Sequence, residues 1–425
     1  MNLTRRDFIG ASSAFAAAGC VGTGCDDGKA VAWRPGHYQV HYIYTGRGES
    51  MLHIFPDGTS MLLDVGDTMR FYGTPKEVPI LPDMTRRAGE WVARYVERVN
   101  PKGRTVDYFH LSHYHGDHGG GVRCHGGRVH APTGDYLLCG LGDAARFLSF
   151  GRVIDRAWPT FDDPVDANVS SRDGTANNVR AIYAALQAKG TEIERFRLGA
   201  NDQIRQLDEA QARPGFSVFN LCANGRYVRK DGTVRDLFAH LVKKEGQKFN
   251  ENAMSCGMIV SYGKFRSFTA GDFSASVLDE SGRKIPVEDE LAEAVGPVDV
   301  AKLNHHGHHS MTSGLVRALR ARVWTACVVN QAHCTSDTMD RLADRTAYGE
   351  ERSFIPTYMP RRGRTDAEMA AYLPDVAKEV IEEPCHVILD VAEGGETYSV
   401  SCVSAATETP RLRGRYDFRA KAADC

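Results

Sequence analysis

The sequence predicts an α/β fold in which two mixed sheets pack face to face and helices cover their outer faces, a four-layer αββα sandwich. Three observations lead to this prediction. Strand and helix patterns alternate along the chain, the second half repeats the plan of the first, and polar residues follow the ends of strands in both halves. The 425 residues could form one large domain or two ordinary ones. The repeated plan favours one domain over residues 37–405.

The first half opens as a β-meander. Its predicted strands are residues 37–43, 50–55, 60–65 and 105–111, and its predicted helices are residues 89–99, 142–150 and 175–189. The last of these strands is an apolar run that leads directly into a loop rich in histidine.

The second half follows the same order after a strand at residues 216–221 and a charged insertion at residues 225–246. Its predicted elements are a hairpin of strands 255–262 and 265–269, a helix at 288–294, a strand at 298–303, a helix at 313–320, a strand at 323–329 and a closing strand pair at 386–391 and 397–403. The basic residues 406–425 are interpreted as a C-terminal tail.

The N-terminus differs from the rest of the chain. The arginine pair Arg5–Arg6 precedes an alanine-rich apolar stretch that ends at Ala18, which is typical of a twin-arginine signal peptide over residues 1–25. The alternative is an amphipathic leader that stays in place. Lipidation of Cys20 is left open, and it would give the protein a membrane anchor. With residues 26–36 as a linker, we expect export by the twin-arginine route, either to the periplasm or as a membrane-anchored lipoprotein.

Composition excludes a general attraction to polyanions. The net charge is -2, so a nucleic acid or an anionic membrane would have to be attracted by local charges. The 11 cysteines are scattered and form no CxxC zinc knuckle, and pairs such as Cys124 with Cys139 are open alternatives for disulfides.

The strongest chemical signal is a group of metal-binding side chains. His113, His115, Asp117 and His118 lie close together after the strand at residues 105–111. Imidazole and carboxylate groups suit Zn²⁺, and a loop that follows a buried strand can hold them in place. The alternative is a surface loop that is merely rich in histidine. Burying such a cluster without a metal would leave polar groups unsatisfied, so we predict a metal site.

This HxHxDH pattern resembles the signature of the metallo-β-lactamase superfamily, and three further motifs follow the family order across residues 38–403. The resemblance implies that Asp64 supports the metal loop without binding metal and that Asp272 bridges two metals. It also implies that His305 or His306 binds the second metal, and we favour His305. Either aspartate could instead be an ordinary turn residue.

One family ligand is missing from its expected place. The resemblance implies a third histidine for the first metal, on a strand between the histidine loop and Asp272. The strand at residues 216–221 and the residues after it contain none. Asn220, Cys222, Asn224 or a water molecule could take its place, so we expect the first metal to bind more weakly.

A closer resemblance is to the soluble lactamase-like domain of the ComEC competence proteins. It rests on residues 46–50, the Pro-Asp-Gly turn at residues 56–58, residues 252–255 before the predicted hairpin, and the absent middle histidine. It implies hydrolysis of phosphodiesters and not of β-lactam rings.

We therefore expect an exported metal-dependent hydrolase of the nuclease or phosphodiesterase type that uses a metal-activated water. The substrate would be a small-molecule or nucleic-acid phosphodiester, and the cofactor two Zn²⁺ ions, with Mn²⁺ as an alternative. Asp117 and Asp272 are the candidate catalytic residues, and Lys302, Asn304 and His308 are candidate substrate contacts. Two alternatives stay open: a carboxylic ester, lactone or amide hydrolase on the same metals, and a non-catalytic metal-binding surface protein.

Overall fold

The computed structural model describes residues 32–122, 127–132, 136–171, 174–239, 250–273, 276–278, 281–361 and 364–421. The predicted signal peptide, Cys20, Cys124 and most of the predicted linker lie outside these residues. Within the described residues, no helix is long and apolar enough to cross a membrane.

The larger sheet has nine strands in the order β19-β18-β17-β1-β2-β3-β4-β5-β6. Their bounds are β1 Tyr38–Tyr42, β2 Met51–Ile54, β3 Ser60–Leu63, β4 Thr105–Leu111, β5 Ser149–Asp155, β6 Glu192–Arg195, β17 Cys385–Val391, β18 Thr397–Ser404 and β19 Leu412–Arg419. Neighbours from β19 to β3 are antiparallel, and neighbours from β3 to β6 are parallel. The sheet is therefore mixed.

The second sheet has eight strands in the order β16-β15-β14-β11-β10-β7-β8-β9. Their bounds are β7 Phe216–Ala223, β8 Arg226–Val228, β9 Val234–Asp236, β10 Gly257–Tyr262, β11 Phe265–Ala270, β14 Val300–Lys302, β15 Val323–Thr325 and β16 Ser353–Phe354. Strands β11, β14, β15 and β16 are parallel, and the others pair antiparallel. A separate pair is formed by β12 (Ser276–Leu278) and β13 (Lys284–Pro286).

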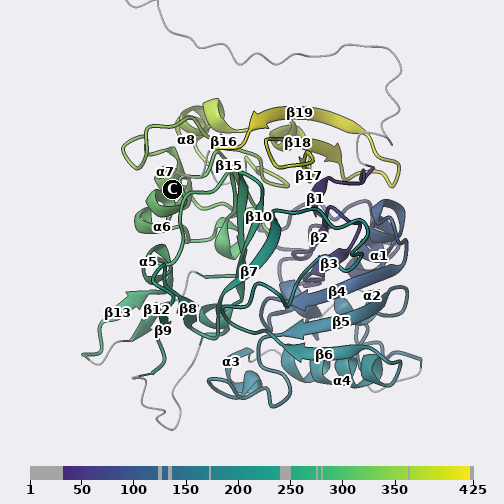
Figure 1. The fold of residues 1–425 in the computed structure, drawn as a ribbon. Coiled ribbons are helices and arrows are strands. Elements are labelled where there is room, and N and C mark those ends of the chain that lie inside the picture. The colour runs from purple at the N-terminus through teal and green to yellow at the C-terminus, as the bar shows by residue number, and fades with distance from the viewer. Residues whose placement is uncertain are drawn as a thin grey trace, which may run out of the picture.

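Helices flank both sheets. They are α1 Ala88–Val99, α2 Leu141–Ala144, α3 Ala167–Ser171, α4 Thr175–Gln187, α5 Val287–Ala292, α6 Ser313–Leu319, α7 Ser336–Ala343, α8 Asp366–Tyr372 and α9 Glu379–Glu382, with short helical turns η1 Gly116–Gly120, η2 Glu251–Met254, η3 Asn304–Gly307 and η4 Leu373–Asp375. Figure 1 shows α1, α2 and α4 beside the nine-stranded sheet and α5, α6 and α7 beside the eight-stranded sheet, on opposite sides of the molecule.

The two faces of the nine-stranded sheet belong to different hydrophobic clusters. Met61 of β3 lies in one cluster with Val260 of the eight-stranded sheet. The next residue, Leu62, lies in a second cluster with Val92 of α1 and Val179 of α4. This alternation follows from the two-residue period of a strand, which buries apolar side chains on both faces. The predicted α/β fold with two mixed sheets and helices is confirmed.

Among the differences from the prediction, two concern the nine-stranded sheet. Residues 142–150 were expected to form one helix, but α2 ends at Ala144 and β5 begins at Ser149, where it pairs with β4. Residues 412–419 lie in β19 and not in a tail, because they pair with β18 while Tyr416 and Phe418 pack on the core. The charged residues around these aromatic residues, Arg415, Asp417 and Arg419, hid the alternating pattern of a strand.

Candidate metal centre

The candidate metal-binding side chains come from loops at the ends of strands in both sheets. They are His113, His115, Asp117 and His118 after β4, Asp272 after β11, His305 and His306 after β14, and Glu49 between β1 and β2. Because β11 and β14 are parallel neighbours, their following loops lie at the same edge of the eight-stranded sheet.

Four of these residues form a compact buried group. One potential ligand atom from each of Glu49, His118, Asp272 and His306 lies within 4.8 Å of the other three, and all four side chains are buried. Asp272 Oδ2 lies 3.1 Å from His118 Nε2 and 3.5 Å from His306 Nε2. This group could hold a metal ion, which is the part of the cofactor prediction that the geometry bears out.

The remaining predicted ligands surround the same carboxylate. His113 Nε2 lies 3.9 Å from Asp272 Oδ2 and 3.1 Å from His115 Nδ1. Asp117 Oδ2 lies 3.6 Å from His306 Nε2. The structure therefore brings His113, His115, Asp117 and His118 together with Asp272 and His306.

The two adjacent histidines after β14 have different neighbours. His306 belongs to the buried group, whereas His305 lies with its Nε2 3.3 Å from Asn252 Nδ2. Both residues adopt a left-handed backbone, with φ of 55° at His306 and 48° at His305, which is uncommon outside glycine. The buried group contains His306 and not the favoured His305, and metal binding by either stays a prediction.

Unpartnered atoms test whether the buried group fits a metal. His306 Nε2 and Asp272 Oδ1 are buried and have no hydrogen-bond partner among the described residues. The carboxylate oxygens nearest to His306 Nε2 lie at 3.5 and 3.6 Å, which is too far for a hydrogen bond. Buried polar atoms normally have a partner, and imidazole with carboxylate oxygen is a donor set that Zn²⁺ accepts. The residues present therefore fit a metal ion.

Asp64 holds the histidine loop in place. Its carboxylate accepts hydrogen bonds from the backbone N–H and the hydroxyl of Ser112, both at 2.7 Å, and lies 2.7 Å from His118 Nδ1. This contact leaves His118 Nε2 facing Asp272. Two residues on, a Cβ at Gly66 would lie 1.8 Å from Asp117 O, so only glycine allows the strand end to approach the loop this closely.

Asp64→Asn is expected to lower the affinity for Zn²⁺ by about 10–100-fold, the usual effect of removing a group that orients a metal ligand. The amide retains the shape of the side chain but loses the negative charge that supports a protonated His118 Nδ1. Competition with a chromophoric chelator measures this affinity. Asp202→Asn is the control, because Asp202 is exposed and pairs with Arg197. Equal affinities for the two variants would contradict the role given to Asp64.

Glu251 and Arg156 brace the same loop from the other side. Glu251 Oε1 accepts a hydrogen bond from the Tyr114 N–H at 2.8 Å, between the first two histidines of the motif. Arg156 contacts both carboxylate oxygens of Glu251, at 2.9 and 2.8 Å, and both side chains are fully buried. This bidentate pair ties the loop to η2, which contains Asn252.

Glu49 was not among the predicted site residues, and it contacts Lys302. Lys302 Nζ lies 2.8 Å from Glu49 Oε1, and neither side chain is exposed. Glu49 Oε2 lies 3.3 Å from His306 Nδ1. Lys302 therefore balances a carboxylate beneath the metal group, and the expectation that it contacts substrate stays a prediction.

Asn304 and His308, the other two predicted substrate contacts, differ in exposure. Asn304 is buried and donates a hydrogen bond to Glu288 Oε1 at 2.6 Å. His308 is partly exposed, and its ring lies 5.2 Å from the ring of His305. A substrate contact by His308 stays a prediction.

The three residues that could have replaced the missing histidine, Asn220, Cys222 and Asn224, make contacts with other parts of the protein. Asn220 donates to Arg197 O and Gln203 Oε1, at 3.0 and 2.9 Å. Asn224 is bonded to Arg156, and Cys222 lies in the hydrophobic core.

Asn252, by contrast, lies beside a predicted ligand, with its Nδ2 3.3 Å from His305 Nε2. It lines one cavity together with Asp272, and its Oδ1 is buried without a hydrogen-bond partner among the described residues. Its place just before the hairpin that ends at Asp272 was the available signal in the sequence.

Metal binding is expected to release protons. Burial lowers the pKa of His306, but nearby carboxylates, Asp272 first, outweigh burial and raise it to about 10. Burial likewise lowers the pKa of His118, and Asp272 with Asp64 raises it well above its ordinary value. Both rings are thus protonated at neutral pH without metal, and a ring nitrogen must lose its proton to bind one.

The affinity for Zn²⁺ should therefore rise from pH 6 to pH 8, a range below the His306 pKa of about 10. We expect about a tenfold increase for each pH unit and each proton released. Calorimetry in buffers of different ionisation enthalpy counts the protons. An affinity that does not change with pH would contradict this charge state.

A cavity of about 850 Å³ opens beside the metal group. His115, Asp117, Asn252, Asp272 and His305 lie on its wall. Asp117 is about a quarter exposed, whereas Asp272 is almost fully buried. A ligand in this cavity would therefore meet the metal group on the side of Asp117 and His115.

No family model matches this sequence, and no curated protein matches it either.

Proposed function

We propose that this chain is a metal-dependent hydrolase of phosphodiester bonds with a metallo-β-lactamase fold. The observation that carries the proposal is the Asp272 carboxylate, which is buried and faces nitrogen atoms of His118, His306 and His113 at 3.1, 3.5 and 3.9 Å. A carboxylate placed among several imidazoles at the wall of a cavity is suited to bridge metal ions that act on a bound ester.

The proposed fold is the four-layer αββα sandwich, and the proposed branch is that of the ComEC-like domains. One hydrophobic cluster contains residues of both sheets, and a second joins the outer face of the nine-stranded sheet to α1, α2 and α4. This division supports the order helix, sheet, sheet, helix. The meeting of the HxHxDH loop with Asp64, Asp272 and His306 supports the family resemblance.

Two metal ions are proposed, Zn²⁺ in preference to Mn²⁺. His113, His115 and Asp272 would hold the first, and Asp117, His118, Asp272 and His306 the second. Bound metal ions supply an activated water at neutral pH and stabilise negative charge on the reacting ester.

The protein side chains have separate tasks at this site. Asp272 carries negative charge between the histidines. Asp64 contacts Nδ1 of His118, so that Nε2 of this ring faces Asp272. Cys327 O, 2.9 Å from His306 Nδ1, orients that ring, and Glu49 of the buried Glu49–Lys302 pair lies 3.3 Å from the same nitrogen. The partly exposed Asp117 marks the side from which a substrate can approach.

Hydrolysis of two chromogenic esters tests the proposal. Zinc-loaded protein should release p-nitrophenol from bis(p-nitrophenyl) phosphate, and a chelator should stop the reaction. Turnover of p-nitrophenyl acetate alone would overturn the phosphodiester assignment in favour of an acyl hydrolase. Metal-loaded protein that acts on neither ester would favour the metal-binding surface protein.

A further inference from the structure

The cavity beside the metal group carries positive charge that belongs to no ligand of the proposed metals. Its wall includes Arg70, from the segment between β3 and α1, and Arg128, from the segment between η1 and α2. Both side chains belong to exposed residues. The acidic groups on the same wall, Asp117 and Asp272, belong to the metal group itself.

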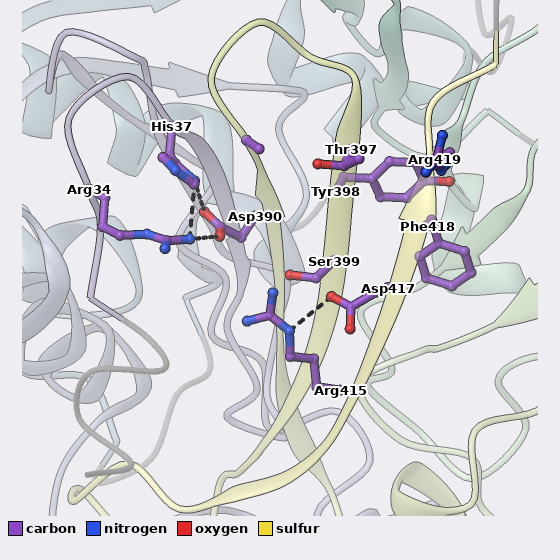
Figure 2. Close-up of a pocket in the computed structure, with 11 residues that line it drawn as sticks. Arg34, His37, Asp390, Thr397, Tyr398, Ser399, Arg415, Asp417, Phe418 and Arg419 are labelled. Carbon is purple, nitrogen blue, oxygen red and sulfur yellow. Dashed lines mark hydrogen bonds and ion pairs between the residues drawn. The ribbon is translucent and has the colours of Figure 1, made fainter. Parts of the chain in front are cut away.

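Neither guanidinium is neutralised by an ion pair within the described residues. Arg70 stacks over the ring of Phe71 at 5.6 Å, a contact that leaves its N–H donors free. A pocket over β17, β18 and β19 provides the contrast, because Arg34 and Arg415 there pair with Asp390 and Asp417 at 2.9 and 3.0 Å (Figure 2). An arginine without a carboxylate partner offers its fork of donors to a phosphate group.

A buried hydroxyl lies on the same wall. Ser171, at the end of α3, is 5% exposed, and its Oγ has no hydrogen-bond partner among the described residues. A buried hydroxyl without a partner is costly, so a group that fills this part of the cavity would be bound by it. The hydroxyl can donate to an oxyanion, as the two guanidinium groups can.

We propose that Arg70, Arg128 and Ser171 form an anion subsite beside the metal group, and that the substrate is a phosphodiester carrying a second phosphate. This inference rests on the proposed function, because the scissile phosphate is taken to lie at the metal group. The subsite supplies the local attraction that a chain of net charge -2 lacks as a whole. A substrate with a single charged group would leave both arginines unused.

Two substrates that differ only in the second phosphate test the subsite. Thymidine 5′-(p-nitrophenyl phosphate) and the same compound with a 3′-phosphate both release p-nitrophenol. We expect wild-type kcat/KM to favour the 3′-phosphorylated compound by about a hundredfold, and Arg70→Gln and Arg128→Gln each to reduce this preference by about tenfold. Arg205→Gln is the control, because Arg205 is exposed and does not line the cavity.

Binding without catalysis separates the subsite from the proposed function. Calorimetry with thymidine 3′,5′-bisphosphate on chelator-treated protein should show binding that each cavity variant weakens by about tenfold and Arg205→Gln does not. Binding that depends on the arginines, with neither ester hydrolysed by zinc-loaded protein, would support the subsite and overturn the phosphodiesterase. Hydrolysis with no preference for the second phosphate, and equal binding by all variants, would overturn the subsite alone.

Discussion

Asp272→Asn is expected to abolish tight metal binding and to lower phosphodiester hydrolysis by at least about a thousandfold, which corresponds to about 4 kcal/mol of activation free energy. Asp272 is the carboxylate shared by the nearest histidines, with His118 at 3.1 Å and His306 at 3.5 Å. Asparagine has almost the same shape but no charge, so the change removes the bridging group and leaves the packing in place.

Three measurements on the same preparations test this prediction. They are bound zinc, hydrolysis of bis(p-nitrophenyl) phosphate and circular dichroism, which checks that the variant is folded. Asp202→Asn makes the same chemical change at an exposed site and should behave as wild type. A folded Asp272→Asn protein that retains zinc and activity would show that Asp272 is a turn residue and not a bridge.

Lys302→Met is expected to destabilise the metal-free protein by about 3–5 kcal/mol, the usual cost of removing one partner of a buried ion pair. Lys302 and Glu49 are both fully buried at 2.8 Å. Burial lowers the pKa of Lys302, but Glu49 outweighs it, so the ammonium group stays charged. Without this ammonium group, less positive charge would balance the Glu49 carboxylate, which lies near Asp272 and Asp117.

Urea unfolding of chelator-treated protein measures this loss. Lys264→Met is the matched control, since its pair with Glu396 has a similar length of 2.9 Å but is exposed on both sides, at 52% and 63%. Exposed pairs contribute about 0–1 kcal/mol. The double variant Lys302→Met with Glu49→Gln should recover part of the loss. A stability of Lys302→Met equal to that of Lys264→Met would contradict the balancing role.

The sequence predicted those parts of the site that depend on a short motif and the strand directly before it. The HxHxDH loop follows a strand that was placed at its observed bounds, and the Gly-Asp motif ends a hairpin that forms as expected. Asp64 lies within its predicted strand, one residue beyond the observed end of β3, and contacts His118. In each case a short motif and the strand before it determine where the side chain points.

The contacts between distant segments could not be predicted. Glu49 and Lys302 are 253 residues apart, and nothing near either residue indicates that it is buried against the other. The choice between His305 and His306 depends on a left-handed backbone at both residues, a conformation that is uncommon outside glycine and that the neighbouring sequence does not indicate. Asn252 was overlooked because the missing histidine was sought on β7, whereas η2, held by Glu251, lies next to the metal loop.

Metal content of the purified protein shows whether the buried histidines and carboxylates bind metal. Plasma mass spectrometry should be run on wild type, His118→Ala and His130→Ala after exposure to Zn²⁺ and removal of free metal. His130 is an exposed histidine that does not line the cavity beside the metal group. We expect about two zinc ions in wild type and His130→Ala, and a clear loss in His118→Ala. A folded wild-type protein that retains no metal would contradict this expectation.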